Sequence, residues 1–292
     1  MTTSMDGKTV LITGGNCGIG KETAVELAKL GARVVFTSRD AAKGAAAGAD
    51  VSRRAGREVA WLPLDLASFA SVRRFAGDFL GRYDRLDVLV NNAGLILQER
   101  TETEDGFETT FGVNHLGHFL LTQLLLDRVK ASAPARIVNL SSDAHRSARD
   151  GLDFDDLQTA QRYGALRAYS RSKLANIYFT RELARRLDGA GVTANAVHPG
   201  GVATGFGQDG DFKGVFAFGY GLIRPFLRSP AKGAETSVYL ASAPELAGVS
   251  GKYFADSKEK ETTPAAQDDA AARRLWEVSE TLVASIRPPA ST

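Results

Sequence analysis

The sequence predicts an α/β fold with a doubly wound parallel β-sheet flanked by helices on both faces. Two observations lead to this prediction. Short β-branched or apolar runs alternate with longer helical patterns, and the first run ends in a glycine-rich turn that leads into an amphipathic helix. Such alternation indicates βαβ units, whose right-handed crossovers place helices on both faces of a parallel sheet.

Six short runs are expected to form strands: Thr9–Thr13, Ala32–Ser38, Glu58–Pro63, Leu86–Val90, Arg136–Leu140 and Val192–His198. Apolar residues at helical spacing predict four helices between them: Ile19–Leu30, Ser68–Arg82, Gly106–Lys130 and Ala165–Asp188. A helix over Ala41–Ala55 is only weakly indicated, because Gly44 and Gly48 interrupt it. After Gly251 we expect a short strand, a polar stretch and a helix from Asp268 to Ile286, followed by a frayed tail at 286–292.

The composition excludes several classes of protein. Lysine and arginine total 36 against 34 for aspartate and glutamate, so no excess of positive charge exists to hold a nucleic acid. The single cysteine, Cys17, excludes an internal disulfide framework. The polar segment Met1–Lys8 has no signal or anchor pattern, and the longest apolar run, Leu116–Leu126, is shorter than the roughly 20 residues that span a bilayer. We therefore expect a cytoplasmic protein with no integral membrane segment.

A glycine-rich turn follows the first predicted strand, in residues 13–20 (TGGNCGIG). Glycines at 14, 18 and 20 allow the backbone to turn tightly and to approach a pyrophosphate without an intervening Cβ. The amide groups at the start of the following helix then point at that negative charge. A strand, a glycine turn and a helix in this order predict a Rossmann-type sheet that binds a dinucleotide.

The end of the second predicted strand indicates which dinucleotide is preferred. An acidic side chain there accepts from a ribose 2′-hydroxyl, whereas an arginine accommodates a 2′-phosphate. Arg39 can pair with phosphate oxygens, and Ser38 brings no carboxylate that would repel them. NADP(H) is therefore expected over NAD(H). Asp40 is the competing feature, because an inward-facing carboxylate would favour NAD(H).

Tyr169 and Lys173 lie in a helical pattern that places a phenol and an ammonium on one face, one turn apart. The ammonium and a cationic nicotinamide would lower the phenol's pKa from its usual value near ~10. Tyr169 could then protonate a carbonyl oxygen or deprotonate an alcohol. Tyr163 and Arg167 are separated by the same number of residues, so the spacing alone does not single out Tyr169. Position favours Tyr169, which follows the fifth predicted strand, because ligands bind at the carboxyl ends of the strands in doubly wound sheets.

The fifth predicted strand runs into Ser141 and Ser142, and a serine hydroxyl there could donate to a substrate oxygen as charge develops on it. Strand alternation favours Ser142 without excluding Ser141. No carboxylate or cysteine completes a metal-ligand pattern with the histidines His115, His118 and His145, so no metal site is expected.

Together these residues resemble the short-chain dehydrogenase/reductase family, from about Lys8 to Ala255. The family's adenine-contacting pair is similar to Asp65-Leu66, and its Asn-Asn-Ala-Gly signature stands at 91–94. The resemblance implies that Ser142 binds the oxyanion, that Tyr169 is the acid-base, and that Lys173 holds the ribose and lowers the tyrosine pKa. The implied catalytic set is Asn114, Ser142, Tyr169 and Lys173. The expected cofactor-binding residues are Gly14, Asn16, Gly18, Ile19, Gly20, Arg39, Asp65, Leu66, Asn92, Ala93, Gly94, Tyr169, Lys173, Pro199, Gly200, Val202 and Thr204.

Within the family, three segments look like the retinol-dehydrogenase-like branch: 111–119 (FGVNHLGHF), 172–176 (SKLAN) and 272–276 (ARRLW). That resemblance implies NADP(H) and a small lipophilic alcohol or aldehyde. The interval from Ser142 to Tyr169 is long, as in that branch, and its loop with Leu152, Phe154 and Leu157 is expected to wall the substrate pocket.

An aromatic-rich segment, 205–229, is predicted to be a substrate lid within a single catalytic domain spanning 1–292. A dimer contact or a helix on a membrane surface would have the same composition, and both alternatives stay open. A homo-oligomer is expected. The predicted function is NADP(H)-dependent transfer of hydride between nicotinamide and a lipophilic alcohol, aldehyde or ketone. The alternatives are a non-catalytic NADP(H)-binding sensor or scaffold and a carbon–carbon double-bond reductase.

Overall fold

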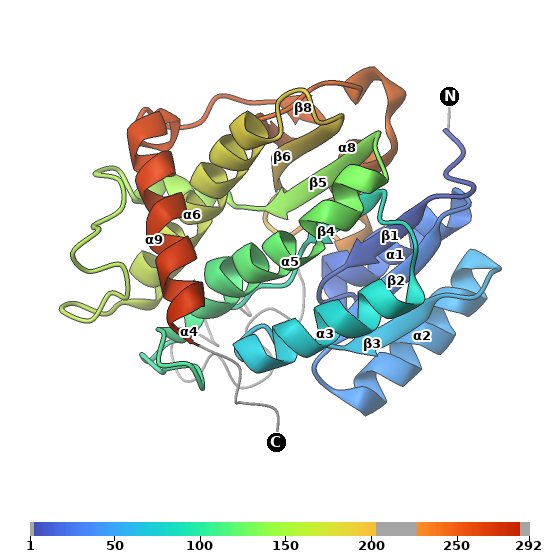
Figure 1. Ribbon diagram of the computed structural model, residues 1–292, viewed down its shortest axis with the longest axis horizontal. Coiled ribbons are helices and arrows are strands. Elements are labelled where there is room, and N and C mark those ends of the chain that lie inside the picture. The colour runs from blue at the N-terminus through green and yellow to red at the C-terminus, as the bar shows by residue number, and fades with distance from the viewer. Residues whose placement is uncertain (1–2, 203–226, 287–292) are drawn as a thin grey trace.

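The structure is a computed structural model that describes residues 3–202 and 227–286. In this part of the chain eight strands form one sheet, in the order β3-β2-β1-β4-β5-β6-β7-β8 (Figure 1). Neighbouring strands are parallel except for β7 and β8, which are antiparallel. Because the chain winds outward from β1 in both directions, the predicted doubly wound parallel sheet is confirmed.

The strands are β1 (Thr9–Ile12), β2 (Arg33–Ser38), β3 (Ala60–Pro63), β4 (Val88–Asn91), β5 (Ala135–Leu140), β6 (Val192–His198), β7 (Tyr253–Ala255) and β8 (Lys258–Glu259). The longer helices are α1 (Gly18–Lys29), α2 (Ala41–Ala55), α3 (Phe69–Arg82), α5 (Gly117–Ala131), α6 (Ala165–Arg186), α8 (Pro230–Ser242) and α9 (Asp269–Ser285). The six strands expected from β-branched runs all form, with ends that differ from the prediction by at most two residues.

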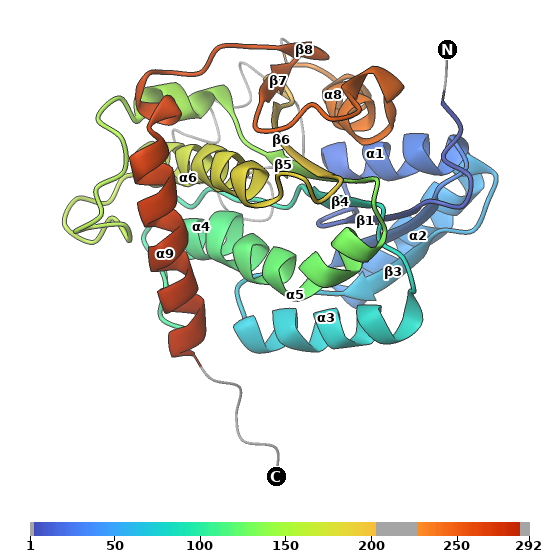
Figure 2. The same cartoon turned by 45° about the horizontal axis from the view of Figure 1, so that its top comes forward.

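Helices cover both faces of the sheet. Helices α1, α2 and α8 pack against one face, and α3, α5 and α6 pack against the other, so each face has its own apolar core (Figure 2). Helix α9 lies outside this arrangement and packs across α6. The central strands β1 and β4 are buried along their whole length, which explains why they are almost entirely apolar.

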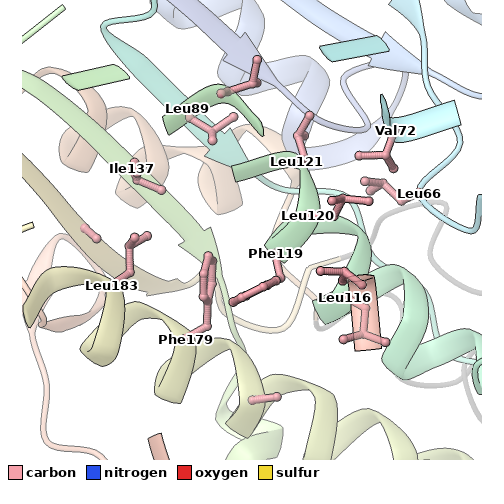
Figure 3. Close-up of a cluster of buried hydrophobic side chains, with 14 of the residues drawn as sticks. Leu66, Val72, Leu89, Leu116, Phe119, Leu120, Leu121, Ile137, Phe179 and Leu183 are labelled. Atoms are coloured by element: carbon pink, nitrogen blue, oxygen red, sulfur yellow. The ribbon is translucent and has the colours of Figure 1, made fainter. Parts of the chain in front are cut away.

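Aromatic rings hold α6 in place. Phe119 on α5 and Phe179 on α6 meet beneath the sheet, with ring centroids 5.6 Å apart (Figure 3). Trp276 on α9 covers both rings and lies 5.0 Å from Phe119. All three side chains are buried, and each such burial contributes on the order of 1.5–3 kcal/mol. This packing matters for function because α6 carries Tyr169 and Lys173.

Helix α2 forms over the whole range Ala41–Ala55, although the sequence pattern predicts this helix only weakly. The two glycines that weaken the pattern have a packing role, because both face the indole ring of Trp61 on β3. A Cβ on Gly44 would lie 2.5 Å from Cε3 of that ring, and a Cβ on Gly48 would lie 3.2 Å from Cδ1. The loss of helix propensity at these positions is thus offset by close helix–sheet contact.

The helix predicted over Gly106–Lys130 starts at Thr109 rather than Gly106 and then runs without a break to Ala131. It begins as the short helix α4 (Thr109–Phe111), because the carboxylate of Glu108 caps it by accepting from the amides of Thr110 and Phe111 at 2.7 and 2.8 Å. A π-helical turn, Gly112–Leu116, then joins α4 to α5. Such turns are frequent at functional sites, and this one carries Asn114.

The polar stretch expected after β7 contains a further strand, β8. Its hairpin turn places Asp256 and Ser257 at φ values of 53° and 55°, the conformation that Asn-Gly usually supplies. The sequence has Asp-Ser in place of Asn-Gly at this turn, so sequence patterns do not predict this hairpin.

Two predictions fall mainly outside the described residues. Of the lid predicted at 205–229, only residues 227–229 are described, and Ser229 caps α8 by accepting from the amide of Lys232. Of the tail predicted at 286–292, only Ile286 is described. Among the helices of residues 3–202 and 227–286, none has the length and apolar character needed to cross a bilayer.

Candidate active site

A cleft of about 420 Å³ opens at the carboxyl ends of the central strands. It lies beside β1 and β4, where the winding of the sheet reverses direction and doubly wound folds bind their ligands. Every predicted cofactor residue that the structure describes lines this cleft, and Thr204 lies outside the described residues. The cleft is also lined by residues that sequence reasoning does not single out as site residues: Thr37, Lys43, Leu95, Val113 and Leu140.

The glycine turn forms a cradle that only glycine can build. Gly14 and Gly18 have φ values of 65° and 55°, which side chains rarely adopt. A Cβ on Gly20 would lie 2.5 Å from the carbonyl oxygen of Gly14 and 2.5 Å from Nδ2 of Asn92. That amide group donates to the carbonyl of Thr13 at 2.8 Å, which ties the turn to the end of β4. The cradle and the adjoining amino terminus of α1 fit the pyrophosphate of a dinucleotide.

At the far end of the cleft, the residues at and after the end of β2 include two basic side chains and one carboxylate. Ser38 donates its hydroxyl proton to the carbonyl of Asp40 at 2.8 Å. The carboxylate of Asp40 caps α2 by accepting from the amide of Lys43 at 2.9 Å. Arg39 and Lys43 both line the cleft. The one carboxylate expected to compete for a ribose hydroxyl is therefore engaged at the start of a helix.

Asn114 lies behind the cleft and is fully buried. Its side-chain amide donates to the carbonyl of Leu95 at 2.9 Å and to Oγ of Ser172 at 3.0 Å, and its Oδ1 accepts from the amide of Leu95 at 2.8 Å. This side chain therefore clamps the loop after β4 to α6. The loop approaches closely, because a Cβ on Gly94 would lie 3.2 Å from Oδ1 of Asn114 and 3.4 Å from Nζ of Lys173.

The two serines after β5 have different environments. Ser141 is buried and donates to the carbonyl oxygen of Lys173 at 2.7 Å. Ser142 is partly exposed to the cleft, where its Oγ accepts from the amide of Ala144 at 3.1 Å and hydrogen-bonds to Tyr169. A hydroxyl oxygen has two lone pairs and one proton, so the bond from Ala144 leaves the Ser142 hydroxyl free to donate toward the cleft. Of the two, Ser142 has the geometry expected of a donor to a substrate oxygen.

Tyr169 and Lys173 meet in the cleft as the helical spacing predicts. Nζ of Lys173 lies 5.5 Å from the centroid of the tyrosine ring and donates to the carbonyl of Leu140 at 3.2 Å. Burial raises the pKa of Tyr169 to about 12, although the hydrogen bond to Ser142 acts in the opposite direction. Burial also lowers the pKa of Lys173 to about 8. The structure thus does not show the lowered phenol pKa that the spacing predicts, because desolvation outweighs the hydrogen bond to Ser142.

The alternative pair does not share this arrangement. Tyr163 precedes α6 and donates its hydroxyl proton to the carbonyl of Leu97 at 2.8 Å, outside the cleft lining. Its interval from Arg167 is therefore not a helical one. The tertiary position of the two tyrosines, rather than their spacing, separates them.

Buried histidines connect the site to its surroundings. Nε2 of His118 lies 2.9 Å from Oγ1 of Thr13, and its Nδ1 lies 3.2 Å from the carbonyl oxygen of Asn114. Nε2 of His115 lies 2.9 Å from Oγ of Ser279 on α9. Over residues 3–202 and 227–286, no three histidine, cysteine, aspartate or glutamate side chains come together in a way that could hold a metal ion.

Comparison with known proteins agrees with this geometry. The family model described as short chain dehydrogenase matches residues 8–153 and 157–211. Human retinol dehydrogenase 14 is 48% identical over 298 residues, which cover 97% of this chain and 88% of the relative. Human retinol dehydrogenase 13 is 48% identical over 286 residues, which cover 96% of this chain and 86% of the relative.

Solved structures give the same result. A crystal structure of a protein from Mycobacterium Paratuberculosis matches with a TM-score of 0.76 and 35% identity, covering 99% of this chain and 97% of that one. The RhlG/NADP active-site complex from Pseudomonas aeruginosa matches with a TM-score of 0.68 and 28% identity, covering 86% of this chain and 95% of that one. From its fold, its cleft and these relatives, the chain belongs to the short-chain dehydrogenase/reductase family, in the retinol-dehydrogenase-like branch, and is an oxidoreductase.

Proposed function

We propose that this protein catalyses NADP(H)-dependent hydride transfer between nicotinamide and a lipophilic alcohol, aldehyde or ketone. The observation that carries the proposal is the meeting of Ser142, Tyr169 and Lys173 in one cleft with a glycine cradle. A bound dinucleotide would supply or accept the hydride at its nicotinamide ring. The chain's own residues would hold that ring, orient the substrate oxygen and move its proton.

Tyr169 is the proposed proton donor in carbonyl reduction. Because burial raises its pKa to about 12, the phenol is protonated at neutral pH and ready to donate. Ser142 would donate a second hydrogen bond to the same oxygen as negative charge develops there. Lys173, with its pKa near 8, is largely charged at neutral pH and would favour the phenolate left after proton transfer. Asn114 would contribute by clamping the loop at Gly94.

The basic end of the cleft supports NADP(H). Arg39 and Lys43 line the region after β2, and both can pair with a 2′-phosphate. The carboxylate of Asp40 is directed to the amide of Lys43, so it offers little competition. The Pseudomonas aeruginosa relative was solved as a complex with NADP, which adds weight to this assignment.

A lipophilic substrate is supported by the apolar side chains that line the cleft. Leu95, Val113, Leu140 and Val202 line the same cleft as Tyr169. The relatives named retinol dehydrogenases point to an apolar alcohol or aldehyde of the same general class.

We further propose that residues 1–292 act as one catalytic domain. A cytoplasmic location and a homo-oligomer remain predictions of the sequence.

The test is to follow NADPH absorbance with a panel of aliphatic, aromatic and isoprenoid aldehydes and ketones. Tyr169→Phe should lower the rate by roughly two to four orders of magnitude and leave NADPH affinity nearly unchanged, because only the proton donor is lost. Tyr163→Phe is the matched control and should retain activity, since that phenol bonds to Leu97. Full turnover by Tyr169→Phe would remove this residue from the mechanism. Tight NADPH binding without turnover on any carbonyl would favour the sensor or scaffold alternative.

A further inference from the structure

His145 lies directly behind Ser142, in the 3₁₀ turn Asp143–Ser147 that follows β5. Its side chain is completely buried, with 0% of its surface exposed. It does not line the cleft, so it cannot touch substrate or cofactor in this arrangement. Its contacts lead to Ser142 instead.

The carbonyl oxygen of Ser142 accepts two hydrogen bonds from this one residue. The backbone amide of His145 lies 3.0 Å from it, and the ring Nδ1 lies 2.7 Å from it. A carbonyl can only accept, so Nδ1 must carry the ring proton, and Nε2 is left with a lone pair. Burial lowers the pKa of His145, which keeps the ring neutral.

The second ring nitrogen indicates that the ring is not there for packing alone. Nε2 is buried without a hydrogen-bond partner among the described residues, a situation that buried polar atoms usually avoid. The ring packs edge-on against Tyr253 of β7 at 5.2 Å between centroids, a contact that a phenylalanine or leucine would make without the unpartnered nitrogen. A histidine at this position therefore gains the hydrogen bond from Nδ1 to the Ser142 carbonyl, although its Nε2 is buried without a partner among the described residues.

The hydrogen bonds to the carbonyl oxygen restrict the conformation of the reactive serine. Ser142 has an extended backbone, with φ −162° and ψ 154°, and its Oγ accepts from the amide of Ala144. The next residue, Asp143, is held from the other side by the hydroxyl of Tyr253, which donates to its Oδ1 at 3.0 Å. The bonds from His145 to the Ser142 carbonyl therefore hold the same turn whose Ala144 amide holds Oγ of Ser142.

We propose that His145 is a positioning residue, which acts through Ser142 by fixing the turn whose Ala144 amide holds the serine hydroxyl in the cleft. The inference rests on the proposed function, because it concerns the serine that would stabilise the substrate oxygen. It predicts that the Nδ1 donor, and not the aromatic ring, is what the reaction needs.

Two nearly isosteric substitutions test this point. His145→Asn places an amide donor where Nδ1 stands, and His145→Leu has a similar shape without a donor. The leucine variant should lower kcat on a carbonyl substrate by roughly 10- to 100-fold, because a misplaced donor loses most of its effect. Its NADPH dissociation constant should change less than about twofold, and the asparagine variant should stay within about threefold of wild type in kcat. His145→Gln, whose amide reaches the Nε2 position, should behave like leucine, and it replaces leucine if that variant does not fold.

A double-mutant cycle separates a role through Ser142 from a general structural role. In a Ser142→Ala background, measured by single turnover, His145→Leu should cause no further loss of rate. An undiminished loss in that background would overturn the proposal, as would wild-type kcat in the leucine and glutamine variants.

One readout does not depend on turnover. The wild-type protein labelled with ¹⁵N-histidine should show a slowly exchanging imidazole Nδ1 proton that is absent from the His145→Asn spectrum. If that proton is missing, the proposal about His145 is wrong, whatever the activity. A wild-type protein that shows this proton but turns over no carbonyl would instead contradict the proposed function.

Discussion

The glycine cradle allows a sharp test, because Gly20 stands inside helix α1 and yet has no room for a methyl group. A Cβ at this position would lie 2.5 Å from the carbonyl oxygen of Gly14 and 2.5 Å from Nδ2 of Asn92. Ordinary van der Waals contact begins near 3.4 Å, so both neighbours must retreat by almost 1 Å. One of them is backbone, and the other donates to Thr13, so neither moves freely.

Gly20→Ala should therefore weaken coenzyme binding. Overpacking of this kind costs about 1–3 kcal/mol, which corresponds to a roughly 5- to 150-fold higher dissociation constant if the strain acts on the bound conformation. The alanine also gains up to ~1 kcal/mol of helix propensity, which offsets part of the strain in the free energy of unfolding but not in coenzyme affinity. The assay is titration of the protein with NADPH, followed by nucleotide fluorescence, together with urea unfolding.

Gly77→Ala is the matched control. Gly77 also lies within a helix, α3, but a Cβ there would meet nothing within 4 Å. This substitution should leave NADPH affinity unchanged and stabilise the protein by up to ~1 kcal/mol through helix propensity alone. If Gly20→Ala had the same NADPH affinity and the same stability as Gly77→Ala, the argument that close backbone approach requires glycine at position 20 would be refuted.

Three further outcomes are expected. Arg39→Ala and Lys43→Ala should each reduce the NADPH-over-NADH ratio of kcat/KM by roughly 10-fold, since each removes a charge-assisted bond to the 2′-phosphate; an unchanged ratio in both variants would reject this assignment. Gly44→Ala should lower the free energy of unfolding by about 1–3 kcal/mol, because its Cβ would meet Trp61 at 2.5 Å, and an equal or higher urea midpoint would contradict that contact. Burial lowers the pKa of His115 to about 3 and of His118 to about 4. As pH falls below about 6.5, only the unfolded chain takes up these protons. The contribution of each neutral histidine to the free energy of unfolding is therefore fully present above that pH. It should be lost toward pH 4, by up to ~1.4 kcal/mol per pH unit for each histidine. Urea midpoints from pH 7 to 4.5 measure this slope, which should be smaller in His118→Gln, and an identical slope in that variant would argue against it.

Local patterns are sufficient to predict the sheet and much of the cleft. The strand runs, the glycine turn and the Tyr169–Lys173 spacing all depend on residues close together in sequence, and parallel strands bring their carboxyl ends to one edge. Residues as distant in sequence as Gly14 and Pro199 can therefore be assigned to one cleft from the strand pattern and the family resemblance.

Other features depend on contacts between distant residues, which sequence spacing does not record. The glycines of α2 weaken its prediction because their partner, Trp61, lies on a different strand. The helix expected from Gly106 begins later, at Thr109, because Glu108 caps it there. Lys43 lines the cleft because α2 begins beside Arg39, and the sequence indicates that helix only weakly.

By itself, the sequence determined the fold class and the dinucleotide turn and named the candidate residues for proton transfer, because each follows from short-range geometry and side-chain chemistry. The tertiary structure alone decided that Ser142 rather than Ser141 hydrogen-bonds to Tyr169, that Asn114 is a clamp behind the cleft, and that burial raises the phenol's pKa. Desolvation and hydrogen-bond partners are properties of the packed surroundings, so they become defined only when distant parts of the chain come together.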